Sequence, residues 1–261
     1  MSTLTDGQFQ INANGVVLGT SQYMVQDVTG LFRDARSSDY ERANSDGAIM
    51  GPDWQQPKTV TIMLTIVGTS PANTTALFDA LAVDWNAARS TEGFQGTTSL
   101  RFQIPGRVTQ TLIGGRPRRL EPNWATIGQS FLRVGASYYC PDPRIYGDVV
   151  KTATLTYNGA GVPITNAGNY PAGVVWAMGA STNPSVTRGV SSFQISAIVP
   201  AGLSFNVKTD NKTVVRSDNN GNQYATFSGP WLEIPAGTTT FSSAATSPTG
   251  TCIGTYRDTW I

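Results

Sequence analysis

Three patterns in the sequence predict a mainly β protein with two domains. Apolar and polar residues alternate strictly over Lys58–Val67, which is the period of a half-buried strand. One segment, Ala72–Arg89, carries apolar residues at helical spacing. After residue 146, short apolar segments are separated by turn residues, as is typical of a β-sandwich. We therefore expect an α+β N-terminal domain with one helix, residues 1–145, and an all-β C-terminal domain, residues 146–261.

The first domain contains the clearest strand and helix signals. The alternating strand places its aliphatic residues on one face: Val60, Ile62, Leu64 and Ile66. Gly68–Pro71 follows as a helix-start signal with proline near the first turn. The helix expected over 72–89 presents one apolar stripe: Leu77, Phe78, Leu81, Trp85 and Ala88.

Further strands are expected between this helix and the domain boundary: Ser99–Ile104, Arg107–Ile113 and Ile127–Tyr139. Gly114–Arg119, with the sequence GGRPRR, has the composition of a loop. Cys140–Gly147 interrupts the strand pattern with two prolines, and we place the domain boundary there.

The second domain is expected to consist of strands joined by short turns. Asp218–Gly221 predicts a hairpin, because Asn-Gly tolerates the positive φ angles of a type I′ turn. The expected strands are Val149–Tyr157, Ala172–Ala177, Ser192–Val199, Leu203–Lys208, Thr213–Arg216, Gln223–Phe227, Trp231–Ile234, Thr238–Ser242 and Cys252–Trp260.

The segment Arg33–Gln56 differs from the rest of the first domain. It has no hydrophobic periodicity and carries eight charges. A stretch of this length without regular structure is usually functional or disordered in a compact domain. We expect a long loop or an extended polar arm.

Composition excludes several classes of function. Lys and Arg total 18 and Asp and Glu 17, so a net charge of +1 gives no reason to expect tight binding to nucleic acid. The chain has no histidine, which removes Ser-His-Asp catalysis and His-based metal sites. Cys140 and Cys252 have no metal spacing and are expected as buried free thiols. We expect no enzymatic activity, no cofactor and no metal. The N-terminus has no signal-peptide pattern and no apolar run spans a membrane, so we expect cytosolic synthesis without membrane insertion.

Two groups of side chains are candidates for binding. Arg116, Arg118 and Arg119 form the densest positive cluster, which fits either contact with DNA or a neighbouring subunit, or a solvated hairpin tip. The hairpin tip is favoured, because no aromatic residues accompany the arginines. In the second domain, Tyr224 and Trp231 are candidate glycan contacts, whereas Trp176 lies in an apolar strand and is expected in the core.

A set of segments along both domains has a recognisable order: Ser45–Gly51, the alternating strand, the single helix, Tyr139–Pro143, Ala153–Asn158, Asn166–Pro171 and Gly229–Gly237. In this order of elements the chain resembles the distal tail protein of long-tailed bacteriophages. The late Pro235–Gly237 turn lacks the asparagine that usually follows in that family, which leaves a related minor tail protein open.

The resemblance implies a structural virion protein at the tail tip with a galectin-like C-terminal sandwich. Six copies would form a ring that joins the tail tube protein to the tail-tip hub and tape-measure proteins, with DNA passing through the lumen. The polar arm would clasp neighbouring copies, because mixed charges can set register between identical subunits. The candidate interface residues are Arg33, Arg36, Asp39, Glu41, Arg42, Asp46 and Trp54. The alternatives are a carbohydrate-binding host-adhesion module, a minor tail or tube subunit, and a glycan hydrolase that uses paired carboxylates.

Overall fold

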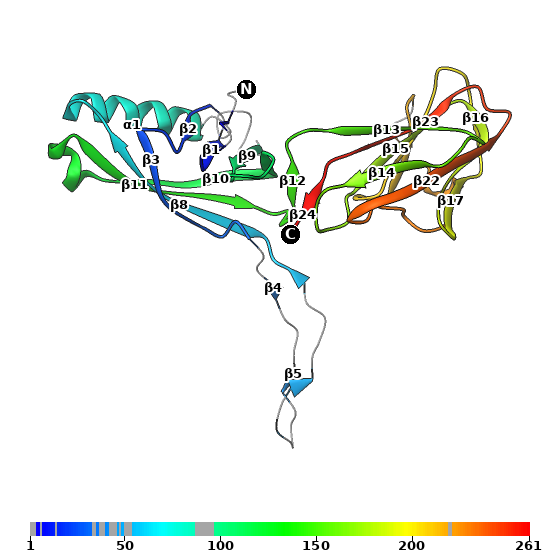
Figure 1. Ribbon diagram of the computed structural model, residues 1–261, viewed down its shortest axis with the longest axis horizontal. Coiled ribbons are helices and arrows are strands. Elements are labelled where there is room, and N and C mark those ends of the chain that lie inside the picture. The colour runs from blue at the N-terminus through cyan, green and yellow to red at the C-terminus, as the bar shows by residue number, and fades with distance from the viewer. Residues whose placement is uncertain are drawn as a thin grey trace. The chain divides into compact units, whose positions relative to one another are not determined.

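The computed structural model divides into two compact units, Met1–Asp148 with Ile261, and Val149–Trp260 (Figure 1). The sequence predicts the division after residue 145. Strands predominate in both units, and the described residues contain one α-helix, which confirms the expected mainly β fold. The structure describes residues 4–5, 7–13, 15–32, 35–36, 40–41, 46, 48–49, 54–86, 97–218 and 221–261, with only the backbone at 13, 35–36, 40–41, 48–49 and 54.

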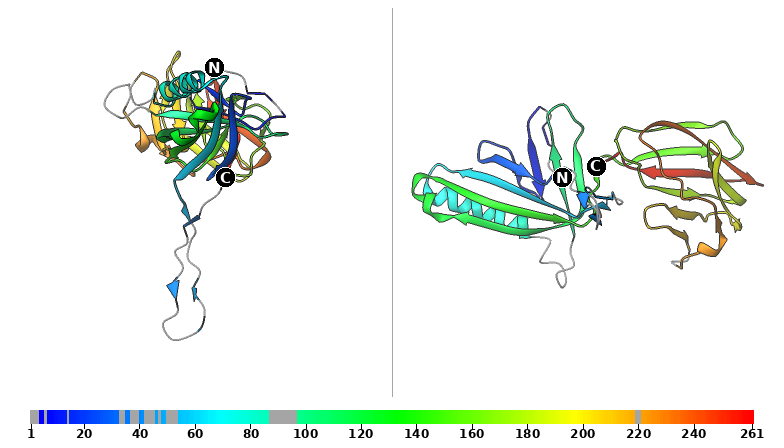
Figure 2. Two further views of the ribbon diagram at one scale, coloured as in Figure 1. Left: turned by 90° about the vertical axis from the view of Figure 1, so that its left-hand side faces the viewer. Right: turned by 90° about the horizontal axis from the view of Figure 1, so that it is seen from below.

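Unit 1 is built on an antiparallel sheet with the strand order β2-β1-β9-β10-β11-β8-β3, and β12 pairs with β10. Helix α1, Pro71–Asn86, runs along the long strands of this sheet (Figure 2). Residues 87–89 of the predicted helix lie outside the described residues. The strands are β1 (Gln10–Ala13), β2 (Val17–Leu18), β3 (Tyr23–Thr29), β8 (Lys58–Val67), β9 (Thr98–Gln103), β10 (Gln110–Asn123), β11 (Phe131–Cys140) and β12 (Ile145–Gly147).

Helix α1 covers one face of the sheet and leaves the other to the surface. Tyr138 of β11 pairs with Val60 of β8, so both side chains point to the same face. The Trp85 ring of α1 meets the Tyr138 ring edge-on at 6.5 Å, and both residues are buried. The face of β8 that carries Val60 and Ile62 is therefore the core face, and Met63 lies on the open face with 46% of its surface exposed.

The described residues of the polar arm between β3 and β8 form two short antiparallel strand pairs. The antiparallel pairs are β4 (Ala35–Arg36) with β7 (Trp54–Gln55), and β5 (Tyr40–Glu41) with β6 (Ala48–Ile49). At its base, Lys58 Nζ donates to the Leu31 carbonyl oxygen at 3.1 Å. Lys58 is buried, and burial lowers the pKa of its ammonium group.

Two expectations for this unit are wrong. Gly114–Arg119 is not a loop, because β10 runs through it. The register of β10 shifts between Leu112 and Gly115 against β9, and between Pro117 and Arg119 against β11. These irregularities accommodate the glycines and the proline within the strand. The strand predicted from Ile127 begins only at Phe131, since the 3-10 helix η2 (Trp124–Gln129) occupies its first residues.

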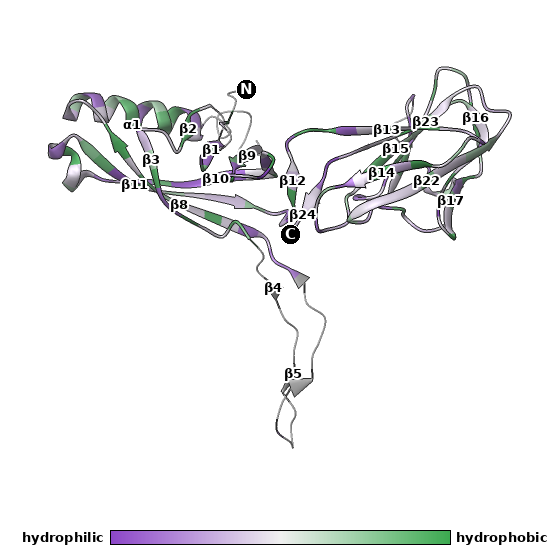
Figure 3. Ribbon diagram, viewed as in Figure 1, coloured by the Kyte–Doolittle hydropathy of each residue, from purple (hydrophilic) through white to green (hydrophobic). Residues whose placement is uncertain are grey.

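Unit 2 consists of two antiparallel sheets that enclose an apolar core, as predicted for a β-sandwich. Its strands are mostly pale in Figure 3, because Thr, Ser and Ala fill their outward positions. One sheet has the order β13 (Lys151–Thr156), β23 (Thr251–Tyr256), β15 (Val174–Met178), β19 (Phe205–Lys208) and β20 (Thr213–Arg216). The other has β14 (Val162–Asn166), β22 (Gly237–Thr246), β16 (Ser181–Arg188), β17 (Ser191–Ile195) and β21 (Phe227–Ser228), with β18 (Ile198–Val199) paired to β16. The remaining elements are η3 (Tyr224–Thr226) and β24 (Thr259–Trp260).

The core of the sandwich forms around Trp176, as the sequence predicts. Trp176 is fully buried, and its indole Nε1 donates to the Leu232 carbonyl oxygen at 3.1 Å. Trp231–Ile234 does not form the expected strand. Ile234 makes an isolated bridge with Ala172 instead, since two prolines flank the segment and cannot donate to a ladder.

The Asn166 side chain organises the backbone where β14 ends. Its Nδ2 donates to the Tyr170 carbonyl oxygen at 2.8 Å, and its Oδ1 accepts from the backbone amides of Gly168 and Thr259 at 3.0 and 3.1 Å. Asn166 is fully buried, so these bonds satisfy an otherwise costly polar group. The Asn166–Pro171 motif therefore has a structural role.

Candidate interaction surfaces

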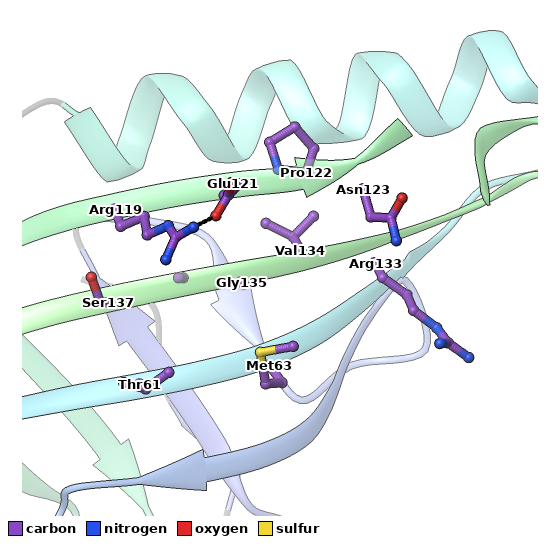
Figure 4. Close-up of a pocket in the computed structure, with 11 residues that line it drawn as sticks. Thr61, Met63, Arg119, Glu121, Pro122, Asn123, Arg133, Val134, Gly135 and Ser137 are labelled. Carbon is purple, nitrogen blue, oxygen red and sulfur yellow. Dashed lines mark ion pairs between the residues drawn. The ribbon is translucent and has the colours of Figure 1, made fainter. Parts of the chain in front are cut away.

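The open face of the unit 1 sheet contains a hollow of about 710 Å³ (Figure 4). Its floor is Gly135 of β11, which pairs with Met63 of β8 and Glu121 of β10. A Cβ atom at Gly135 would meet only Met63 Sδ, at 3.7 Å, so packing does not require glycine there. A glycine within a strand often marks a close approach by a ligand or another backbone. This hollow is therefore the first candidate contact surface.

The three predicted arginines lie on this open face and not at a hairpin tip. Arg116 pairs with Tyr139 and Arg119 with Ser137, and Ser137 and Tyr139 share one side of β11. The Arg118 guanidinium lies 5.1 Å from the centre of the Tyr139 ring, a cation–π contact. An aromatic ring therefore accompanies the arginines in the fold, although none is interleaved with them in the sequence.

Arg119 and one arginine that the sequence analysis missed line the hollow itself. Arg119 forms an ion pair with Glu121, and both side chains are more than half exposed. Such an exposed pair contributes little stability. Arg133 of β11 faces the hollow from the strand opposite Asn123 (Figure 4). Cross-strand register brings Arg133 to this surface, and no local motif in the sequence indicates it.

The arm residues predicted as an interface are only partly described. Arg36, Glu41 and Trp54 belong to the short strands β4, β5 and β7, and Asp46 is exposed. Arg33, Asp39 and Arg42 lie outside the described residues. Of the described candidates, Arg36 pairs with Trp54, and Glu41 pairs with Ala48.

A cluster of aromatic rings in unit 2 includes both predicted glycan contacts. Phe227, which the sequence analysis did not single out, stacks on Trp231 with ring centres 4.2 Å apart and planes at 15°. Tyr224 lies 6.1 Å from Trp231 and 6.2 Å from Phe227, at 18° and 27°. Tyr224 is 55% exposed, and Trp231 is partly exposed. The structure thus brings Tyr224 and Trp231 together as predicted.

Asp142 is the hub of a polar cluster that follows β11. Its carboxylate accepts from Arg144 Nε at 3.0 Å, from Arg144 Nη2 at 2.9 Å and from the Tyr146 hydroxyl at 2.6 Å. Burial opposes the charged form, but these donors together hold the pKa of Asp142 below its ordinary value. These bonds join the turn after β11 to Tyr146 of β12, so the cluster shapes the connection between the two strands. Asp142 and Asp148, two carboxylates that a hydrolase could use as a pair, form ion pairs with Arg144 and with Arg101 respectively.

The thiols and the titratable groups give no sign of reaction chemistry in the described residues. Cys140 and Cys252 are buried and free, which confirms the prediction, and burial raises their pKa to about 11 and about 12. Within the described ranges, no group of three His, Cys, Asp or Glu side chains is placed to hold a metal ion. Among the same residues, no helix is long and apolar enough to cross a membrane.

The two-unit fold is similar to that of a protein from a bacteriophage adsorption apparatus. It is similar to the crystal structure of the Dit protein of phage SPP1, which is described as a paradigm of the hub adsorption apparatus in phages that infect Gram-positive bacteria. The TM-score is 0.69 at 15% sequence identity, and the match covers 97% of this chain and 99% of Dit. The expected resemblance to a distal tail protein is thereby confirmed at the level of the fold.

Two weaker structural matches come from the baseplate of phage p2 in its activated conformation, with Sr and with Ca. Their TM-scores are 0.49 and 0.47 at 10% identity, with 96% of this chain and 97% of each baseplate chain covered. No family model and no curated protein sequence matches the chain.

Proposed function

We propose that this chain is a structural subunit of a phage tail tip, where six copies form a closed ring. The observation that carries the proposal is the match to Dit over 97% of this chain and 99% of that chain, since both units and their order are shared. The ring joins the tail tube to the tail-tip hub and the host-adhesion apparatus. In this role the chain acts by assembly and not by catalysis.

The sheet of unit 1 offers edges through which copies could join. β3 and β2 end the strand order, and each pairs on one side only among the described strands. An unpaired strand edge presents backbone donors and acceptors to another chain. Two different edges make a heterologous contact, and such contacts close into a ring when the rotation between subunits allows it.

The open face of the same sheet suits the wall of a channel. Thr59, Thr61 and Ser137 supply short polar side chains, and Glu121 lies among four arginines, Arg116, Arg118, Arg119 and Arg133. A surface with this positive excess would attract a passing polyanion. We assign this face to the lumen, through which DNA would pass.

The polar arm supplies the specificity of the ring contact. Its opposite charges are interspersed, with Arg33, Arg36 and Arg42 beside Asp34, Asp39 and Glu41. Charge pairs of this kind fix register and suppress wrong pairings more than they add affinity. The arm of each copy would therefore select the position of its neighbour.

Light scattering after size exclusion, with negative-stain images of the peak, tests the proposal. The expected mass is six times the 27.8 kDa of one chain, in annular particles. If the free chain is monomeric, the measurement is repeated with purified tail tubes as template, and caps at the tube ends are expected. Chains that neither self-associate nor cap tubes would refute the proposal, and long polymers would indicate a tube subunit instead. Deletion of residues 35–50 should leave a folded chain that no longer closes the ring.

A further inference from the structure

Exposure within the aromatic cluster of unit 2 is uneven: Tyr224 is 55% exposed, whereas Trp231 and Phe227 are partly exposed and pack against the core of the sandwich. Phe227 contacts the buried Phe193 ring at 5.3 Å and Trp231 at 4.2 Å, so Trp231 is the outer member of this series. The ring of Tyr224 lies about equally far from the rings of Trp231 and Phe227, so it lies beside this stacked pair. It therefore does not cover the face of Trp231 that points away from Phe227.

The backbone fixes the position of the Trp231 ring before any ligand arrives. Gly229, two residues earlier, has φ +108°, and a Cβ atom there would lie 2.8 Å from Phe193 Cα. Only glycine permits this close approach to β17. Pro230, which follows Gly229 and precedes Trp231, has its own φ angle fixed by the pyrrolidine ring. Little conformational entropy would therefore be lost when a ligand binds this surface.

The chemistry around the rings is neutral and rich in hydrogen-bonding groups. From Asn219 to Tyr256 the only charged residue is Glu233. Gln223 and Ser228 flank the rings in sequence, and the residues between them are small except for the aromatics themselves. Arg188 Nη1 donates to the Glu233 carbonyl oxygen at 2.8 Å, so this guanidinium group is engaged with the backbone.

We infer that Tyr224 and Trp231 form a binding surface for an uncharged glycan. The apolar C–H face of a pyranose ring stacks on an aromatic ring, and its equatorial hydroxyl groups reach amide and hydroxyl side chains at the rim. An anionic saccharide would find no cation within the segment that carries the rings. The inference rests on unit 2 alone and does not depend on the ring assembly.

The test uses the full-length chain on a printed array of neutral oligosaccharides. Saturation-transfer NMR follows with the methyl glycosides of glucose, galactose, mannose and N-acetylglucosamine as probes. We expect saturable binding that Tyr224→Ala weakens about tenfold or more, as for an aromatic anchor in an interface. Tyr224→Phe should retain binding, because the ring face is kept.

Three controls keep the result interpretable. Trp124→Ala removes another half-exposed aromatic, in unit 1, and should leave glycan binding unchanged. Thermal unfolding should be unaffected by Tyr224→Ala, since that ring is 55% exposed. The oligomeric mass of the same variant should match the wild-type value, which separates this surface from the proposed ring contacts. Absence of binding to every neutral glycan, or equal binding by Tyr224→Ala, would overturn the inference.

Discussion

Substituting alanine at two glycines of neighbouring strands should change stability in opposite directions. Gly135 of β11 has no positive φ, and a new Cβ atom would meet only Met63 Sδ at 3.7 Å. Gly135→Ala should therefore stabilise unit 1 by about 0.4–1 kcal/mol, because alanine reduces the entropy of the unfolded chain.

At Gly115 of β10 the same change should be destabilising. A Cβ atom there would lie 2.7 Å from Cζ and 2.8 Å from Oη of Tyr138. The Tyr138 ring cannot yield, because it is fully buried beside Trp85 and its hydroxyl donates to the Thr98 carbonyl oxygen at 2.7 Å. We expect Gly115→Ala to cost about 1–3 kcal/mol, the usual cost of overpacking a core.

Differential scanning calorimetry of the two variants measures both effects on the transition of unit 1. A gain of 1 kcal/mol raises Tm by about 2–4 °C in a unit of this size. If Gly135→Ala lowers Tm as much as Gly115→Ala does, other atoms cover Gly135 in the free chain. The hollow on the open face of the unit 1 sheet could then not be a contact surface.

Three further outcomes follow from the contacts described above. Asp142→Asn should lower the free energy of unfolding by about 1–3 kcal/mol near pH 7, as measured by urea unfolding. Because folding lowers the pKa of Asp142, the carboxylate stabilises the fold fully above its ordinary pKa of 3.8, and this stabilisation disappears as the pH falls through the lowered pKa. The stabilities of variant and wild type should therefore converge at that low pH. Trp176→Phe should cost about 2–4 kcal/mol by the same assay, because it leaves a cavity and an unpartnered Leu232 carbonyl; a loss below about 0.5 kcal/mol would contradict the packing described. Cys140 and Cys252 should not react with a disulfide reagent in the native chain at about pH 8, and both should react after unfolding, since burial holds their pKa at about 11 and about 12.

The elements with local signals were predictable from the sequence. The alternation of apolar and polar residues in β8 and the apolar stripe of α1 are patterns within short segments. The apolar residues around Trp176 likewise predict that its side chain is buried. Gly114–Arg119 was not predictable, because its glycines and proline are as compatible with bulges inside a strand as with a loop. Only pairing with β9 and β11 decides between these conformations.

The candidate surfaces show the same limit. Tyr224 and Trp231 are predicted together, but Phe227, which lies between them in the sequence, belongs to the edge strand β21 and only the fold shows its ring stacked on Trp231. Arg133 reaches the hollow through its register against Asn123. Register depends on contacts between distant segments, which one sequence does not reveal.

The strand order of the sandwich has a consequence for its synthesis on the ribosome. β23, the last strand of its sheet in the chain, lies between β13 and β15, and Asn166 completes its hydrogen bonds with the amide of Thr259. Until residues 251–256 leave the exit tunnel, β13 has no partner on the side that β23 will occupy. The long strands of unit 1 can pair earlier in translation, whereas the sandwich must wait for β23. A product truncated before β23 would therefore carry an open, aggregation-prone sandwich.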